Sequence, residues 1–277
     1  MSFSRAIVFL TDFGEDEFYA GVLRAVAASI APASPLIDLS HRLRPHDVRL
    51  ASFVLALSFE YLPPDAVVVA VVDPGVGSAR RALIAEFGRR SVVAPDNGLV
   101  SDLLVSKAEA RIVAIAEGAA GRVAGVPACG ATFHGRDVFA PVAAALARGE
   151  RPDAFGSDGG GVVLLGDVPS VSIEDAGGVT GGRITGTGRM IDHFGNILSD
   201  IPRAAVDRVF GSRPCRVSVS GVDAGPLRRT YADGSPGELI ALLNSWDRVE
   251  AAVREGRAAD RFPGRAAGDI RFELRGW

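Results

Sequence analysis

The stretch AVVVAVVDPGVGSAR, residues 66–80, decides the fold that we predict for this sequence. Its first seven residues form an unbroken apolar run, which is typical of a strand buried on both faces of a parallel sheet. The run ends at the carboxylate of Asp73, and a turn-forming Pro-Gly-Val-Gly segment follows before Arg80. A carboxylate that ends so apolar a strand needs a partner or a ligand. The stretch therefore predicts a sheet core beside a candidate site, with a structural Asp73–Arg80 ion pair as the simpler alternative.

Strand-like and helical patterns alternate on both sides of this stretch. Short apolar runs typical of strands occupy residues 6–10, 35–40, 81–87, 91–94 and 111–117. Apolar residues at helical spacing occupy residues 17–32, 46–62, 98–108 and 136–150. This alternation predicts an α/β domain with a mostly parallel sheet and flanking helices.

The composition changes in the second half of the chain. Residues 153–182 are rich in Gly, Asp and Ser, and we interpret them as a linker or hairpin loop. Short apolar runs separated by turn residues follow, which is the pattern of a smaller, mainly β, barrel-like domain. We therefore predict two domains, residues 1–170 and residues 171–277.

The overall composition argues against several classes of protein. The net charge of −3 favours neither nucleic acid nor an anionic membrane as a partner. The two cysteines, with no CxxC pair, indicate neither a disulfide framework nor a zinc cage. No apolar run resembles a signal peptide or a membrane span, so we expect a cytoplasmic protein.

Polar side chains stand at or near the ends of the predicted strands. The positions are Asp12, Asp73, Asn97 and His134. Ligands of open α/β sheets bind beyond the carboxyl ends of the strands, so we expect these side chains to share one site. Each also has a structural alternative as a turn, cap or loop residue. The sequence contains no GxGxxG turn after its first strand, no P-loop lysine, no GxSxG and no HExxH. A metal site at His41 and His46 is a weak alternative, and we expect no metal or cofactor.

Seven segments, in this order, resemble one known family. They are LTDFG (10–14), DPGVGSAR (73–80), APDNGL (94–99), TFHGRDVFAP (132–141), DHFGN (192–196), TYADG (230–234) and ELIALLNS (238–245). The family is that of the S-adenosylmethionine (SAM) hydroxide adenosyltransferases, the adenosine-forming SAM hydrolases, which are relatives of the SAM-dependent fluorinase and chlorinase. The resemblance covers nearly the whole chain.

The resemblance implies a fold, an assembly and a reaction. It implies an α/β domain, a C-terminal β-barrel-like domain and a homotrimer whose active site lies between subunits. The reaction is SAM plus water to adenosine plus L-methionine, without a metal, so that SAM is the substrate and not a cofactor. The implied catalytic residues are Asp73, Arg80 and His134. Halogenases of the group carry Tyr where Asp73 stands, so the chain resembles the hydroxide branch.

The resemblance also implies the residues that bind SAM. They are Asp12, Glu17, His46, Asn97, Gly135, Asp192, Phe194, Asn196, Ser245 and Trp246. Phe194 would pack on the adenine, Asn196 would bond its edge, and Ser245 would contact the amino acid. By the same resemblance, the second domain would supply the adenine and methionine contacts, and the first would carry the catalytic residues.

Three positions depart from the family pattern, and three questions stay open. Glu17 replaces an Asp, His46 stands where halogenases have a Trp, and Trp246-Asp247-Arg248 replaces the usual residues after Ser245. A halide-using relative and a SAM- or adenosine-binding protein without turnover are the alternative functions. The sequence also leaves open whether Asp73 or His134 takes the proton of the attacking water.

Overall fold

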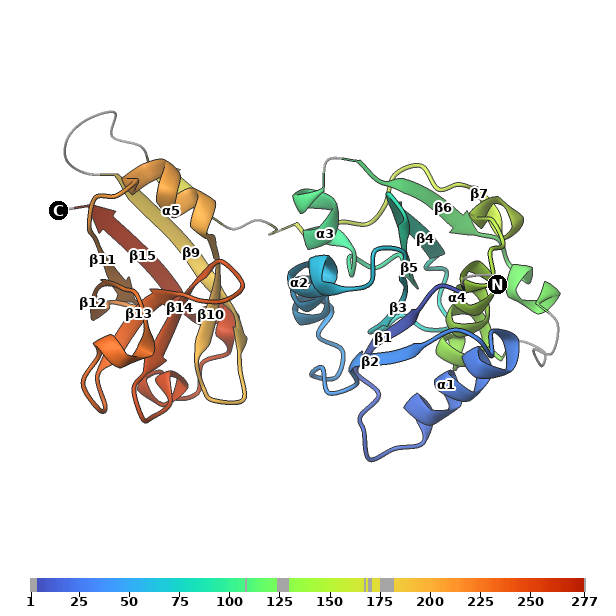
Figure 1. Cartoon of the computed structure of the whole chain (residues 1–277), viewed down its shortest axis with the longest axis horizontal. Helices are drawn as coiled ribbons and strands as arrows, with labels where there is room; N and C mark the ends of the chain where they lie inside the picture. The colour runs from blue at the N-terminus through green and yellow to red at the C-terminus, as the bar shows by residue number, and fades with distance from the viewer. Residues whose placement is uncertain are drawn as a thin grey trace. The chain divides into compact units, whose positions relative to one another are not determined.

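The computed structural model of the chain describes residues 4–107, 109–123, 130–166, 168, 171–174 and 182–276. The chain divides into two compact units, residues 1–168 and residues 169–277 (Figure 1). Among the described residues, no helix combines the length and the apolar character that crossing a membrane requires.

A seven-stranded mixed sheet organises the first unit, in the order β2-β1-β3-β5-β4-β6-β7. Its strands are β1 (Ile7–Thr11), β2 (Leu36–Ser40), β3 (Val67–Val71), β4 (Ala82–Phe87), β5 (Arg90–Pro95), β6 (Arg111–Ile115) and β7 (Gly156–Asp158). The neighbours from β2 to β5 are parallel, and the remaining pairs are antiparallel. Only residues 88 and 89 join β4 to β5, too few for the crossover that parallel neighbours require.

Helices cover both faces of this sheet. They are α1 (Tyr19–Ile30), α2 (Val48–Ser58), α3 (Ser101–Ser106) and α4 (Ala140–Ala147), and a π-helix (Gly135–Phe139) leads into α4. Val67 and Val69 of β3 pack in one core with residues of α1 and α4. Val68 and Ala70 pack in another core with residues of α2 and α3. The apolar run that opened our argument is thus a central strand buried on both faces.

The second unit is a closed barrel of seven strands. Its elements are β8 (Ser172–Glu174), β9 (Arg183–Ile191), β10 (Ile197–Pro202), α5 (Arg203–Phe210), β11 (Cys215–Val219), β12 (Val222–Arg228), β13 (Leu239–Leu243), β14 (Arg248–Val253) and β15 (Arg271–Gly276). The order is β10-β14-β13-β12-β11-β15-β9-β8, and the pairing of β10 with β9 closes the ring. The predicted fold class, an α/β sheet with flanking helices plus a barrel-like β part, is confirmed.

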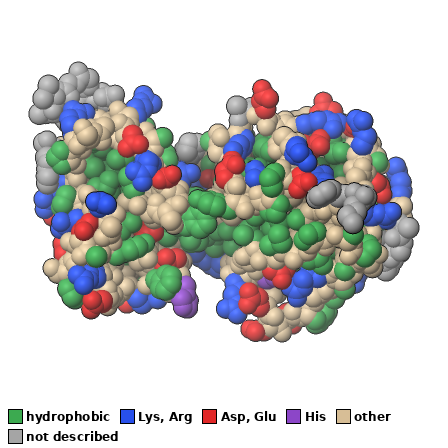
Figure 2. Space-filling view, viewed as in Figure 1, with side chains coloured by type: hydrophobic (Ala, Val, Ile, Leu, Met, Phe, Trp, Pro, Cys, Tyr) green, Lys and Arg blue, Asp and Glu red, His purple; other side chains and the backbone are tan. Residues whose placement is uncertain are grey.

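Short 3-10 helices complete the described secondary structure. They are Phe59–Tyr61, Ala119–Arg122, Pro152–Ala154, Tyr231–Asp233, Ala258–Arg261 and Ala267–Asp269. On the face drawn in Figure 2, positive and negative side chains are interspersed over the described residues, in keeping with the small net charge.

The glycine-rich stretch that we interpreted as a linker or loop departs from that prediction. Residues 156–158 form β7, which pairs with β6 at the edge of the first sheet. A Cβ atom on Gly156 would collide with the carbonyl oxygen of Ala114, so glycine is what allows the two strands to approach. Residues 175–181, at the other end of the stretch, lie outside the described residues.

Candidate active site

The chain doubles back after β3 and carries Arg80 onto Asp73. Successive turns over residues 73–76 and 75–78 are closed by backbone hydrogen bonds of 3.2 and 3.1 Å. Gly77 has a φ of +78°, and a Cβ atom there would stand 3.0 Å from the carbonyl oxygen of Ala131. The turn thus requires glycine both for its left-handed backbone and for the close approach of a neighbouring segment.

Asp73, Arg80 and His134 form a hydrogen-bonded row. Arg80 Nε donates to the two carboxylate oxygens of Asp73 at 2.9 and 3.0 Å, and Arg80 Nη2 donates to Oδ2 as well. The same Nη2 lies 2.9 Å from Nδ1 of His134. The side chains of Asp73 and Arg80 are 6% and 10% exposed, so this is a largely desolvated ion pair. Phe139 lies with its ring centroid 5.3 Å from the Arg80 guanidinium.

The row also fixes the state of the imidazole. A guanidinium has no acceptor, so Nδ1 of His134 must accept a hydrogen bond from Arg80 Nη2, and the neutral ring carries its own proton on Nε2. Burial and the Arg80 charge lower the pKa of His134 below its usual value of 6.5, and Asp73 and Asp137 oppose this shift. His134 is therefore a neutral donor through Nε2 near pH 7.

A cavity of about 690 Å³ lies in front of Asp73 and His134. Its lining includes the side chain of Asp12, whose Oδ2 accepts the backbone N–H of His46 at 2.8 Å. His46 also lines the cavity and has a φ of +65°. Aromatic rings form part of the wall: Phe13 and Phe133 meet edge-to-face with centroids 5.7 Å apart, and Phe18 and Tyr19 are stacked with centroids 4.5 Å apart. This size and mixed lining suit a small ligand with apolar and hydroxyl groups.

A second cavity, of about 660 Å³, also adjoins the row. Arg80 and His134 line it, together with parts of residues 77–82 and 114–118. His134 therefore borders both cavities, whereas Asp73 borders the first one.

Three other residues predicted for the site lie in different settings. Asn97 donates through Nδ2 to the carbonyl oxygen of Val72 at 2.9 Å, and its Oδ1 accepts the N–H of Leu99 at 3.2 Å, so its side chain holds the end of β3 and its own turn. Gly135 lines the cavity, where a Cβ atom would press on the rings of Phe13 and Phe133. Glu17 is exposed and is not part of the cavity lining.

The histidine that could have marked a metal site has other partners. His41 is buried, its Nδ1 lies 2.7 Å from the hydroxyl of Thr11, and its Nε2 lies 3.1 Å from Asp38. Within the described ranges, no group of three His, Cys, Asp or Glu side chains is placed to hold a metal ion.

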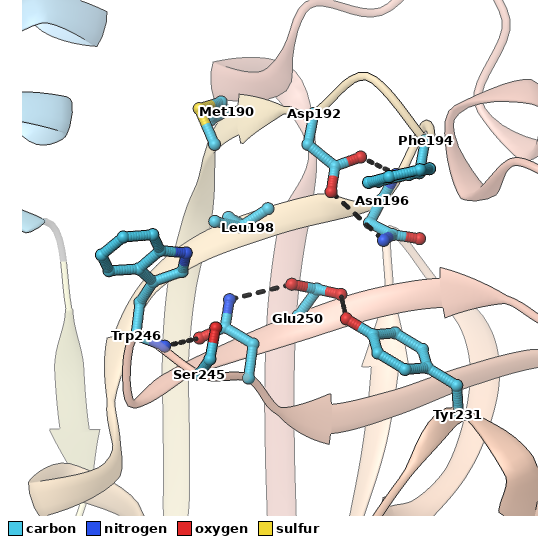
Figure 3. Close-up of a pocket in the computed structure, with 10 residues that line it drawn as sticks. Met190, Asp192, Phe194, Asn196, Leu198, Tyr231, Ser245, Trp246 and Glu250 are labelled. Carbon is cyan, nitrogen blue, oxygen red and sulfur yellow. Dashed lines mark hydrogen bonds between the residues drawn. The ribbon is translucent and has the colours of Figure 1, made fainter. Parts of the chain in front are cut away.

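The barrel carries a pocket of its own, of about 410 Å³ (Figure 3). Its lining residues are Met190, Asp192, Phe194, Asn196, Leu198, Tyr231, Asn244, Ser245, Trp246 and Glu250. Asp192 accepts the backbone N–H and the amide Nδ2 of Asn196, at 2.8 and 3.2 Å. The Phe194 ring is 71% exposed, so an apolar face is available at the pocket. All five residues predicted in this half of the chain line the one pocket.

Sequence reasoning missed half of this lining: Met190, Leu198, Tyr231, Asn244 and Glu250. Tyr231 and Asn244 lie within segments that carried the family resemblance, but no role was assigned to them. Glu250 had a weaker signal as the one carboxylate in the apolar run of β14.

Comparisons with known proteins agree with this arrangement. Residues 7–156 match the SAM hydroxide adenosyltransferase N-terminal domain, and residues 189–271 match the C-terminal domain. A curated relative from Thermus thermophilus, named (R)-S-adenosyl-L-methionine hydrolase, is 39% identical over 259 residues, 92% of this chain and 94% of the relative. A relative of the same name from Salinispora arenicola is 39% identical over 268 residues, 92% of each chain.

Solved structures are similar over almost the whole chain. A crystal structure of an uncharacterized conserved protein from Thermotoga maritima has a TM-score of 0.84 at 30% identity, covering 97% of this chain and 99% of the other. A conserved hypothetical protein from Thermus thermophilus has a TM-score of 0.72 at 34% identity, covering 98% and 99%. These matches confirm the resemblance that the motifs indicated: the chain belongs to the SAM hydroxide adenosyltransferase family.

Proposed function

We propose that this protein hydrolyses SAM by attack of water at C5′, giving adenosine and L-methionine. The observation that carries the proposal is the Asp73–Arg80–His134 row at the wall of a cavity large enough for a nucleoside. The names of the curated relatives support the same reaction.

The chemistry suits these residues. Methionine leaves as a neutral thioether, so the C5′–S bond breaks with its electron pair on sulfur and no general acid is needed. The water must be oriented in line with that bond and must lose a proton as the C–O bond forms. In this mechanism Asp73, held by Arg80, accepts the proton of the water and later releases it to solvent. His134 donates its Nε2–H to the water oxygen because its Nδ1 is already engaged.

Binding roles follow the family pattern as proposals. Asp12 and His46 hold the ribose side of SAM, and Gly135 leaves room beside the cavity wall. In the barrel pocket Phe194 and Asn196 take the adenine.

The remaining groups of the pocket meet the amino-acid part of SAM, and we propose Asp192, Ser245 and Trp246 for this role. Asn97 acts through the strand end that carries Asp73, and Glu17 is the weakest of these assignments. The active protein is proposed to be a cytoplasmic homotrimer that needs no metal, with each site assembled from two subunits. Sedimentation equilibrium would reveal the mass, and a monomer with full activity would contradict the assembly.

The decisive experiment compares the wild type with Asp73→Asn. Chromatography should show SAM converted to equal amounts of adenosine and methionine, at the same rate with EDTA. The substitution should slow turnover by about 10²–10⁴-fold, as for other acid–base groups. The affinity for adenosine, measured by calorimetry, should change little. An equal loss of rate and affinity would reject the water-positioning role of Asp73.

The same assay separates the alternative functions. Adding chloride should leave the products unchanged, and a 5′-chloro nucleoside would identify a halide-using enzyme. SAM that binds but stays intact over hours would identify a binding protein. The relatives' name also specifies an (R) substrate, and since L already describes the α-carbon, we propose that the (R) sulfonium epimer is preferred. Separated epimers would test this preference.

A further inference from the structure

Glu250 is a buried carboxylate with apolar neighbours across the barrel strands. The strand register places it between Leu198 of β10 and Leu242 of β13. It is 3% exposed. Its neighbours along β14, Val249 and Ala251, belong to the barrel core, so Glu250 points to the opposite face, where it lines the pocket. A carboxylate in this position is costly unless its oxygens are bonded.

Both oxygens of Glu250 are bonded, and both partners line the same pocket (Figure 3). The hydroxyl of Tyr231 donates to Oε1 at 2.7 Å, and the amide Nδ2 of Asn244 donates to Oε2 at 2.8 Å. Burial raises the pKa of Glu250, and the two hydrogen bonds oppose this rise. In Figure 3, Glu250 lies between Trp246 on one side of the pocket and Tyr231 on the other.

Asn244 connects Glu250 to the loop that carries Ser245 and Trp246. Its Oδ1 accepts the backbone N–H of Trp246 at 2.9 Å and that of Arg248 at 3.1 Å. The amide of Asn244 is therefore oriented, with its oxygen toward the loop and its nitrogen toward Glu250. The bond to Glu250 fixes the amide that in turn fixes the backbone carrying Ser245 and Trp246.

We propose that Glu250 is a positioning residue for the substrate: it holds Tyr231 directly, and the Ser245–Trp246 loop through Asn244, in the shape that receives SAM. The inference rests on the proposed function, because it assigns SAM to this pocket. Glu250 acts on ligand binding, and the reacting atoms belong to the Asp73–Arg80–His134 row. Its loss should therefore raise KM more than it lowers kcat.

The direction of the Glu250–Asn244 hydrogen bond, with Asn244 as donor, can be tested with three variants. E250Q removes the charge and replaces one acceptor oxygen by a donor, so the bond to Tyr231 or to Asn244 must be lost or reversed in direction. N244D sets two carboxylates against each other. In the double variant N244D/E250Q, the amide introduced at position 250 can donate to the carboxylate introduced at position 244. The Tyr231 hydroxyl keeps an acceptor, the loop keeps the oxygen that binds its N–H groups, and the net charge is conserved.

The expected result is a loss in each single variant and recovery in the double variant. Each single substitution should raise the KM for SAM and the Kd for L-methionine about 10- to 100-fold, the range for a hydrogen bond to a charged group. The double variant should return to within a few-fold of the wild type. E255Q alters an exposed glutamate of the same barrel and should match the wild type.

Several outcomes would overturn the inference. A purely structural carboxylate would lower the melting temperature of the single variants and leave KM and Kd unchanged. A double variant no better than the worse single variant would also reject it. If the single variants do not fold, Y231F removes one of the two bonds of Glu250 by changing a side chain that is partly exposed. An unchanged Kd for L-methionine in Y231F would then overturn the proposal. Wild-type enzyme that leaves SAM intact would reject the proposed function instead, and methionine binding would still test Glu250.

Discussion

Arg80 donates through Nη2 to Nδ1 of His134 across 2.9 Å, and this bond selects the tautomer of the histidine. The proton of the neutral ring lies on Nε2, which leaves His134 as a donor. In the proposed mechanism the two groups, either of which could have served as base, therefore have different tasks: Asp73 accepts the proton of the water and His134 donates a hydrogen bond. The sequence left open which residue takes the proton of the attacking water, and this bond is a structural reason to favour Asp73 over His134.

The tautomer of His134 can be measured. We expect ¹⁵N NMR of the wild type at pH 7.5 to show one histidine with an unprotonated Nδ1 and a protonated Nε2 whose signals change in Arg80→Ala. The hydrogen bond from Arg80 to Nδ1 causes this preference, while burial and the Arg80 charge lower the pKa of His134 and keep the ring neutral. A protonated Nδ1 at His134 would contradict the donor geometry of the row.

The acid limit of the enzyme should follow the lowered pKa of His134. Because the folded-state pKa lies below 6.5, the unfolded chain binds the proton first as the pH falls. The contribution of His134 to stability is therefore present above pH 6.5 and is lost on acidification toward the folded pKa. We expect kcat to persist at pH 6.5 and to fall below it, since an imidazolium would face the Arg80 guanidinium. A pH–rate profile with its acid limb above 6.5 would count against this.

Arg80→Lys should inactivate the enzyme although it keeps the charge. A lysine presents a point charge and cannot donate in a fork to Asp73 and His134 together. We expect kcat to fall by about 10²-fold or more, within the range for catalytic proton-transfer groups. Arg90→Lys is the matched control, because Arg90 also lies over an aromatic ring, with its guanidinium 5.2 Å from the ring centroid of Phe59. R90K turning over as slowly as R80K would indicate a general effect of losing a guanidinium.

Gly77→Ala should lower the free energy of unfolding and slow turnover. An alanine in left-handed backbone costs about 1–2 kcal/mol, and the Ala131 carbonyl adds a close contact. Gly14→Ala isolates the first effect, because Gly14 has the same φ of +78° with nothing within 4 Å of its Cβ position. Urea unfolding should show a larger loss for G77A than for G14A, and equal losses would remove the argument for close approach.

Asn97→Ala should reduce kcat more than it raises KM. Both bonds of the Asn97 side chain are lost, and the one to the carbonyl of Val72, next to Asp73, is the one that anchors the carboxylate. Steady-state kinetics checks this, with Asn97→Asp restoring only the acceptor for Leu99. A change confined to KM would instead favour direct contact between Asn97 and SAM.

Sequence reasoning reached the fold class because its signals are local. The run at residues 67–71 is apolar at every position, and burial on both faces of the sheet follows from that pattern alone. The glycine-rich stretch that contains β7 gave the opposite signal, because glycine marks both loops and close strand approach. The antiparallel edge of the sheet depends on a two-residue connection that alternation of patterns does not reveal.

The candidate site was also predictable only in part. The family motifs identified Asp73, Arg80 and His134, but the hydrogen bonds that join these side chains are visible only in the structure. The only sequence signal for Glu250, a single carboxylate in the run of β14, was too weak to assign it to the site, since an acid among β-branched and small residues on a strand usually faces water. Only the register, which sets Leu198 and Leu242 beside it, reveals that it is buried.

The place of Trp246 in the wall of the barrel pocket has a practical consequence. The sequence has two tryptophans, and the other is residue 277. In a W277F background the emission of a single indole, 39% exposed and adjoining the pocket, would register each ligand that enters or leaves. The protein thus carries its own optical probe of occupancy, suited to stopped-flow recording of association and release.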